Sequence, residues 1–355
     1  MNIHVFLIFY SIINTVYAQF RNYSNEFLNI GVDAAALGMS KAVVGTCNNI
    51  NAIYLNHSGL ATIKNYEISL MHSSYFAGIA QYNFIGFAMP LDNKSAVGFS
   101  LIRFGVDDIL NTTELIDSKG NINYDKISLF SAADYAFNIA YSKKLKLKGL
   151  RFGVNTKIIR RIIGNFAASW GFGFDAGIQF ERNSWKLGVM LRDITTTFNS
   201  WAINKNEFEK IKSSIPNKNQ ELPNTTEITK PKVQMGIARI FRMNKNFNLL
   251  AEIDLNMRLT KTNDIISTPF ISIAPAVGLQ LDYEKMAFLR FGAGNIQKTT
   301  EFNNARSTSI EPNFGLGFTY KGFQIDYALT NIGNIGNALF SNTFSIKFNY
   351  HSFIQ

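Results

Sequence analysis

Three glycines beside an acidic residue in the run WGFGFDAGIQF, residues 170–180, have a spacing that superficially resembles a nucleotide-binding glycine loop. Such a loop would cradle a phosphate, and it needs a strand before the glycines and a helix after them. Instead, aromatic or apolar residues alternate with Gly171, Gly173, Asp175 and Gly177 through the whole run. This alternation indicates one uninterrupted strand and rejects the phosphate hypothesis. The glycines are better explained by the space they leave beside the strand, either for another segment of the chain that plugs an interior or for close approach of a backbone.

Other residues that could do chemistry are scattered. The loop Asp117–Asn121 lacks the spacing and the closing Glu of a calcium-binding EF-hand loop. No pair of histidines has the spacing of metal ligands on a helix; they are His4, His57, His72 and His351. Cys47 is the only cysteine, which excludes a disulfide within the chain, and no nucleophile elbow is present. We therefore expect no catalytic site, no metal and no cofactor, and a protein that is not an enzyme.

The composition and the N-terminus point to an exported chain. Aromatic residues make up 14% and charged residues 17%, which indicates apolar side chains displayed to something other than the protein's own core. The first eighteen residues are an apolar run ending at Ala18, without Lys or Arg at its start, and predict a signal peptide over residues 1–18. An uncleaved anchor is less favoured, because a spanning helix needs about 20 residues. The net charge of +10 is spread along the chain, so we expect contact with outer-membrane lipid and lipopolysaccharide and no nucleic acid.

Strict alternation of period two dominates the sequence from about residue 67. About fourteen runs, most of roughly ten residues, have one apolar face ending in aromatic residues, as strands of a transmembrane barrel do. They begin near Glu67, Gly78, Ser95, Asp134, Leu150, Ser169, Trp185, Lys232, Phe247, Ile271, Met286, Glu311, Phe323 and Thr343. The sequence thus predicts an all-β fold, a transmembrane antiparallel β-barrel of about fourteen strands over residues 67–355. A soluble periplasmic β-protein is the alternative.

The connections between these runs alternate in length. Every second connection is short, whereas the others include long segments, of which residues 195–231 form the longest. Short periplasmic turns and long external loops are typical of outer-membrane barrels. Before the barrel, residues 19–66 are rich in Ala, Gly and Asn, and we expect a compact periplasmic segment or a plug of the lumen, with one short helix near residues 33–39.

Three blocks of the sequence resemble the PorV/PorQ family, FadL-like outer-membrane proteins of the Bacteroidetes type IX secretion system. The blocks are residues 27–61, 190–201 and 326–348. His57 and Ser58 stand where the family pattern usually has Pro and Ala. The resemblance implies an outer-membrane, non-enzymatic accessory of protein secretion that binds the translocon, a sortase or the C-terminal signal domains of cargo. The alternative is a FadL-type channel for hydrophobic small molecules.

Two further sets of residues could carry function. In the longest loop, Phe198, Trp201 and Phe208 are candidate partner-binding residues, although simple loop variability is an equally good explanation. Charged residues on the inward parity either form internal ion pairs that fix the plug or line a substrate path, and the first is favoured. They are Arg151, Lys157, Asp175, Lys186, Arg192, Glu252, Asp254, Arg258, Asp282, Arg290 and Asp326.

Overall fold

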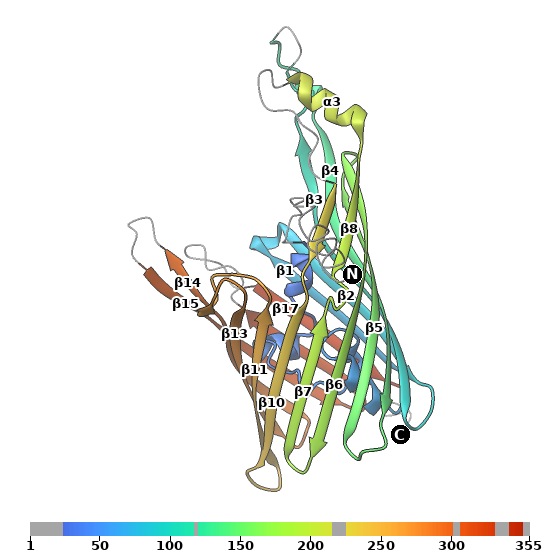
Figure 1. Ribbon diagram of the computed structural model, residues 1–355, viewed down its shortest axis with the longest axis vertical. Helices are drawn as coiled ribbons and strands as arrows, with labels where there is room; N and C mark the ends of the chain where they lie inside the picture. The colour runs from blue at the N-terminus through green and yellow to red at the C-terminus, as the bar shows by residue number, and fades with distance from the viewer. Residues whose placement is uncertain (1–23, 117–119, 215–224, 301–305, 331–340, 351–355) are drawn as a thin grey trace, which may run out of the picture.

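The computed structural model describes residues 24–116, 120–214, 225–300, 306–330 and 341–350, so the predicted signal peptide lies outside the described residues. Fourteen strands of the described chain form a closed antiparallel barrel, as predicted (Figure 1). The barrel closes where Glu67 of the first strand pairs with Asn349 of the last. Its strands are β1 (Glu67–Tyr75), β2 (Ala80–Pro90), β3 (Ser95–Asn111), β4 (Ser128–Lys144), β5 (Leu150–Ile163), β6 (Ala167–Arg182), β7 (Trp185–Arg192), β10 (Lys232–Arg242), β11 (Phe247–Arg258), β13 (Ser272–Tyr283), β14 (Ala287–Thr300), β15 (Arg306–Tyr320), β16 (Phe323–Thr330) and β17 (Ser341–Asn349).

Side chains along these strands point alternately out of the barrel and into it. On β6, Phe172 and Phe174 are exposed on the outer surface, whereas Asp175 and Gln179 are buried inside. Because successive side chains of a strand lie on opposite faces, the apolar parity covers the outside and the small or polar parity lines the lumen. The face assignment predicted from the sequence is confirmed on this strand.

Two strands begin earlier than predicted. Strand β4 starts at Ser128 rather than near Asp134, and β15 starts at Arg306 rather than near Glu311. Pairing of β3 with β4 continues past a bulge between Val106 and Ile109. Backbone hydrogen bonds hold this part of the hairpin together, so its side chains need not alternate in polarity.

The long segment 195–231 is more structured than a loop. It contains β8 (Thr197–Ile203), α3 (Lys205–Ser214) and β9 (Thr226–Thr229). Strand β6 pairs with β7 over its second half and with β8 over its first half. Between β7 and β8 the chain bends at Asp193 and Thr196, whose φ angles are 55° and 59°. The wall therefore continues through this segment instead of ending at Arg192.

The two ends of the barrel differ. We call the end with short connections, at the bottom of Figure 1, the turn end, and the opposite end the loop end. The turn end has connections such as Asn183–Ser184 and Lys321–Gly322. At the loop end, β3, β4 and α3 rise beyond the rest of the wall (Figure 1).

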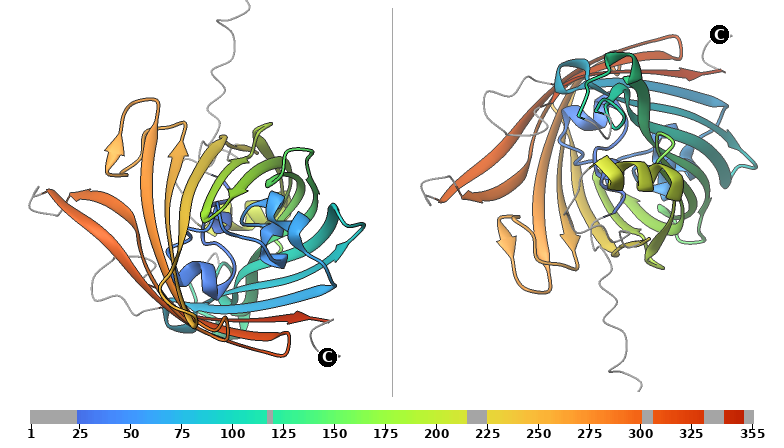
Figure 2. Two further views of the ribbon diagram at one scale, coloured as in Figure 1. Left: turned by 90° about the horizontal axis from the view of Figure 1, so that it is seen from below. Right: turned by 90° about the horizontal axis from the view of Figure 1, so that it is seen from above.

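Residues 24–62 lie inside the barrel and form the plug (Figure 2). Its elements are η1 (Glu26–Asn29), α2 (Ala34–Gly38), η2 (Ile50–Ile53) and η3 (His57–Thr62), and α2 matches the predicted short helix. The hydrophobic core lies between plug and wall, where Ile53 and Leu60 of the plug are fully buried in the same cluster as Tyr82 and Ile102. In the part of the chain that the structure describes, no helix is long and apolar enough to span a membrane.

Candidate functional site

The carboxylate of Asp33 ties the start of the plug to the last strands. Asp33 caps α2 by accepting a hydrogen bond from the amide of Ala35, and its oxygens lie 3.2 and 3.3 Å from Nζ of Lys347 on β17. Lys347 also pairs with Asp326 at 3.1 Å, and Asp326 pairs with Arg290 at 2.8 Å. Because every member of this chain of charges is buried and paired, the plug and three strands are held together by one network.

Two further wall carboxylates hold the centre of the plug. Oδ2 of Asp254 accepts hydrogen bonds from the amides of Val43 and Val44 at 3.0 and 3.1 Å. Glu252, two residues earlier on β11, accepts from the amide of Gly45 at 2.6 Å and from the hydroxyl of Thr46. Successive backbone N–H groups that point to one side form a concavity that favours a negative charge. This turn of the plug is thus fixed by carboxylates that accept from its backbone.

Strands β6 and β7 bind plug carbonyls instead. Gln179 donates to the carbonyl of Val44 at 2.9 Å, and Arg192 donates to that of Tyr54 at 2.9 Å while its guanidinium stacks over the Tyr54 ring. Gly177 on β6 faces Asn56, whose side chain would overlap any Cβ added there. The glycine therefore permits the close approach of the plug that the sequence suggested.

Two ion pairs form among the predicted inward charges, Lys157 with Asp175 and Arg290 with Asp326, and Arg151, Lys186 and Arg258 pair with other acids of the wall and loops. Lys157 lies 2.8 Å from Asp175 and 2.6 Å from Asp193, and all three side chains belong to the wall and are buried. Asp33 with Lys347 is an ion pair between plug and wall, and His57 lies 3.8 Å from Asp175. The expectation of internal ion pairs is confirmed, but the plug is fixed largely by hydrogen bonds to its backbone.

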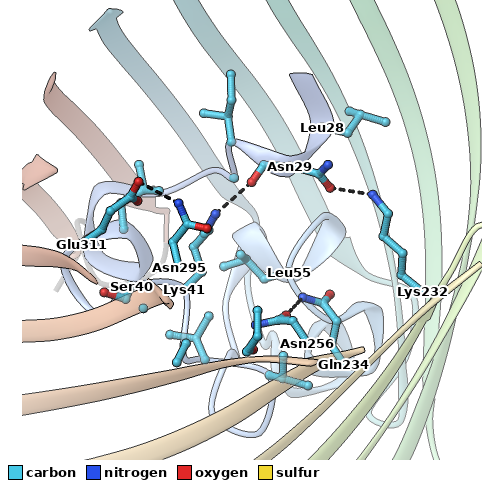
Figure 3. Close-up of a pocket in the computed structure, with 18 of the residues that line it drawn as sticks. Leu28, Asn29, Ser40, Lys41, Leu55, Lys232, Gln234, Asn256, Asn295 and Glu311 are labelled. Atoms are coloured by element: carbon cyan, nitrogen blue, oxygen red, sulfur yellow. Dashed lines mark hydrogen bonds between the residues drawn. The ribbon is translucent and has the colours of Figure 1, made fainter. Parts of the chain in front are cut away.

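A cavity of about 280 Å³ lies between the plug and the wall (Figure 3). The plug contributes Leu28, Asn29, Lys41 and Leu55, and the wall contributes polar side chains, most of which have the inward parity of their strands. These wall residues include Arg192, Lys232, Gln234, Asn256, Arg258, Asn295, Glu311 and Asn313. A second cavity, of about 690 Å³, adjoins the first at the loop end and shares Glu26, Lys232 and Arg258 with it.

Lys41 and Lys232 meet at one asparagine of the plug. Lys41 donates to the backbone carbonyl of Asn29 at 2.8 Å, and Lys232 donates to its side-chain oxygen at 2.8 Å (Figure 3). Burial inside the barrel lowers the pKa of Lys41 to about 8; nearby Arg258 also lowers it, and Glu311 partly opposes this. Lys41 remains accessible from the cavity, so its charge faces the space that a ligand would occupy.

The wall of the first cavity includes a place where two strands separate. Pairing of β13 with β14 ends at Val277 and Ala293. Beyond it, β13 pairs with β12 (Ile266–Ser267), and β14 hydrogen-bonds to residues 263–265. Pro275 of β13 has no amide hydrogen to donate across the gap. Residues on both sides of the separation line the cavity; they are Ala274, Pro275, Ala276, Gly294 and Asn295.

The candidate partner-binding residues do not converge. Phe198 is exposed on the outer face of β8, whereas Trp201 faces inward, with Arg161 stacked 5.1 Å from its ring. Phe208 is half-buried on α3. The three side chains thus form no common surface, and partner contact through them stays a prediction.

The other residues considered for chemistry form no site in the described chain. The cavity was not predicted from the sequence. His72 is hydrogen-bonded to Asn83, and residues 117–119 of the loop considered for calcium lie outside the description. No three His, Cys, Asp or Glu residues of the described chain gather as metal ligands. The sequence contained a signal for the cavity, because Lys232 and Gln234 share one parity of β10, as Asn256 and Arg258 do on β11.

Solved structures with the same architecture cover nearly the whole chain. No protein-family model matches the sequence, and no curated protein matches it. The monoaromatic hydrocarbon channel CymD superposes with a TM-score of 0.55 at 10% identity, over 90% of this chain and 98% of its own. The Pseudomonas putida toluene transporter TodX gives 0.53 at 12%, and a Pseudomonas aeruginosa FadL homologue gives 0.50 at 11%, each over 90% of this chain and 98% of theirs. The fold is that of the FadL-like barrels. At these identities the likeness shows the fold alone, and it does not reach the finer PorV/PorQ assignment.

Proposed function

We propose that the protein is an outer-membrane channel that admits small hydrophobic molecules past a fixed plug. The observation that carries the proposal is the cavity between the plug and the wall, which extends to the place where β13 and β14 separate. A molecule held there would contact side chains that line the lumen and also the residues where β13 and β14 separate. Two structural neighbours, a monoaromatic hydrocarbon channel and a toluene transporter, support this class of ligand.

The apolar outer surface of the barrel supports a location in the outer membrane. Large apolar side chains such as Ile237, Ile253, Val277 and Phe291 are exposed on the outside of neighbouring strands. An outward apolar band with a polar interior is the pattern that transmembrane barrels require. In a water-soluble barrel the same surface would be a large aggregation-prone patch.

A secretion-accessory role is the second candidate and rests on the three family-like blocks. In the structure these blocks contact one another: Asp33 of the first binds Lys347 of the third, and Arg192 of the second binds Tyr54 and Leu55 of the first. Any plugged channel needs such contacts, so the blocks do not favour secretion over transport. Affinity purification from membranes tests this role, and recovery without translocon, sortase or cargo would count against it.

Substitutions at Ala276 and Val277 test the channel. Ala276 is buried against the cavity and Val277 is exposed on the outer face, so Ala276→Phe fills the cavity while Val277→Phe adds the same ring outside. In cells that lack other channels of this kind, we expect Ala276→Phe to reduce the uptake of radiolabelled toluene severalfold and Val277→Phe to leave it unchanged. Heat-modifiable migration on gels shows that both barrels fold. Equal uptake by both folded variants would contradict the proposal.

A further inference from the structure

Two arginines lie on either side of a tryptophan on the outer surface of the barrel, at its turn end. Trp185, the first residue of β7, is directly opposite Arg182 of β6 on one side and Arg239 of β10 on the other. These three strands lie side by side at the front of the barrel in Figure 1. Residues directly opposite each other in a sheet project from the same face, and Trp185 is 46% exposed on the outside. The three side chains therefore form one row on the outer wall, which we call the arginine row.

The arginine row is ordered by aromatic rings and not by acids. The guanidinium carbon of Arg239 lies 5.0 Å from the centre of the Trp185 ring and 4.9 Å from that of Phe241. Stacking orients a guanidinium group and leaves its N–H donors free. Within the part of the chain that the structure describes, Arg182 and Arg239 have no carboxylate at ion-pair distance and no side-chain hydrogen bond. Both arginines can therefore donate to an anion from outside the protein.

The row lies at the boundary between apolar and polar outer surface. The next outward residue toward the loop end is apolar on all three strands; these residues are Phe180, Leu187 and Ile237. On the other side of the row is the polar turn Asn183–Ser184. In transmembrane barrels such a boundary, with its aromatic residues, lies at the depth of the lipid headgroups. A molecule bound here would place an anionic group at the row and apolar chains along the wall.

The charge of the turn end as a whole also favours anions. The six turns that join the barrel strands at this end contain six lysines and two acidic residues, Asp92 and Glu284. Two of the lysines, Lys146 and Lys148, are in the turn before β5, the neighbour of β6. Clusters of lysine and arginine at a membrane surface attract anionic lipid headgroups. This charge concentrates anionic lipid at the turn end, where the arginine row has the geometry to hold one headgroup.

We propose that the arginine row binds an anionic phospholipid of the leaflet at the turn end. The phosphate oxygens accept hydrogen bonds from Arg182 and Arg239, since guanidinium groups match the geometry of a phosphate, and the glycerol backbone lies against Trp185. The acyl chains follow the apolar wall. A headgroup with net negative charge is preferred, because the ammonium of a zwitterionic headgroup would face two guanidinium groups. This site depends on the membrane location of the barrel and not on what passes through its lumen.

Fluorescence of Trp185 in the full-length protein tests the proposal. The chain has three tryptophans, so Trp170→Phe with Trp201→Phe leaves Trp185 as the single reporter. This protein is placed in phosphatidylcholine vesicles that contain increasing fractions of phosphatidylglycerol with brominated acyl chains, which quench an indole that they contact. We expect stronger quenching than with brominated phosphatidylcholine at the same fraction. Arg182→Gln and Arg239→Gln should each lower this preference about fivefold, the effect of one cation near an anionic membrane surface.

Arg242→Gln is the matched control. Arg242 is also exposed and ends β10, but it has the opposite parity to Arg239. Its substitution should retain the preference, and heat-modifiable migration on gels shows that every variant is folded.

Three outcomes would overturn the lipid site. The first is equal quenching by the two brominated lipids, and the second is a loss with Arg242→Gln as large as with Arg239→Gln, which would assign the effect to the general charge of the turn end. The third is inorganic phosphate that, at constant ionic strength, relieves quenching as well as unbrominated phosphatidylglycerol does. The channel is tested separately, because Arg182→Gln should leave toluene uptake unchanged whereas Ala276→Phe should reduce it.

Discussion

At the scale of single residues, Lys41 is a titratable charge that lines the first cavity. Its pKa of about 8 means that the side chain is charged below that pH and neutral above it. Benzoate, used here as a small anionic probe, stays ionised throughout this range and is attracted only by the charged ammonium, so we expect its binding to the purified barrel to fall as the pH rises through about 8. The other charges that act on Lys41 are Glu311, Arg258, Arg192 and Lys232. Equilibrium dialysis of radiolabelled benzoate across this pH range measures the effect. Lys41→Arg should abolish the pH dependence, because the arginine side chain stays charged. Affinity that is constant across the range would contradict the assignment.

Asp33 attaches the N-terminal part of the plug to the last strands of the wall. Asp33→Ala removes the partner of buried Lys347 and leaves it paired with Asp326 alone. Because Asp326 still compensates Lys347, the loss is smaller than the cost of about 3–5 kcal/mol that an uncompensated buried charge would have. We expect faster proteolysis of the plug in the folded barrel, and a control substitution of exposed Asp125 to Ala should not change it. Equal protection in both variants would show that the other plug contacts suffice.

At the scale of elements, the outer face of β6 tests where the membrane surrounds the barrel, because a charged side chain placed against lipid destabilises the fold. Phe174 is exposed on that face, so Phe174→Arg places a cation against lipid and destabilises the barrel by about 2–4 kcal/mol if it lies at the midplane. Leu129, also exposed, is the second residue of β4 and pairs with Leu110 beyond the bulge, at the loop end, so Leu129→Arg should cost far less. Urea unfolding in lipid vesicles measures both. Similar losses at the two positions would mean that the membrane band is placed wrongly.

The wall was predictable from the sequence because a barrel strand must alternate at every residue. The starts of β1, β3, β5, β7 and β10 coincide with those of the alternating runs. Strands β8 and β9 were missed, because they follow a bend within a segment whose length alone suggested a loop.

The cavity could not be derived in the same way. It depends on where β13 and β14 stop pairing and on contacts between residues about 200 positions apart, such as Lys232 with Asn29. Alternation predicts whether a side chain points into the barrel or out of it. It does not predict how far along the barrel axis the residue lies or which residue it contacts across the lumen. The parity of Lys232 and Arg258 was readable, but their convergence on the plug was not.

At the scale of the whole molecule, the plug fills the lumen of the barrel. A wall of fourteen strands is intermediate between small barrels filled by side chains and open porins, so its lumen is wide without a plug. Here residues 24–62 occupy it, clamped by Asp254, Glu252 and Lys347. We expect the intact protein to pass little ionic current in a planar bilayer, and deletion of residues 24–62 to produce large open steps.

Release of the plug without deletion provides the decisive comparison. Glu252→Ala combined with Asp254→Ala removes the carboxylates that accept from the amides of Val43, Val44 and Gly45. Because those amides would then be buried without acceptors, each at a cost of about 1–3 kcal/mol, this turn should leave its place part of the time. We expect brief, large openings in this full-length variant and none with the Asp125→Ala control. If the doubly substituted barrel stays closed and the deleted one conducts, the plug is held by its apolar core with the wall and the carboxylates only orient it.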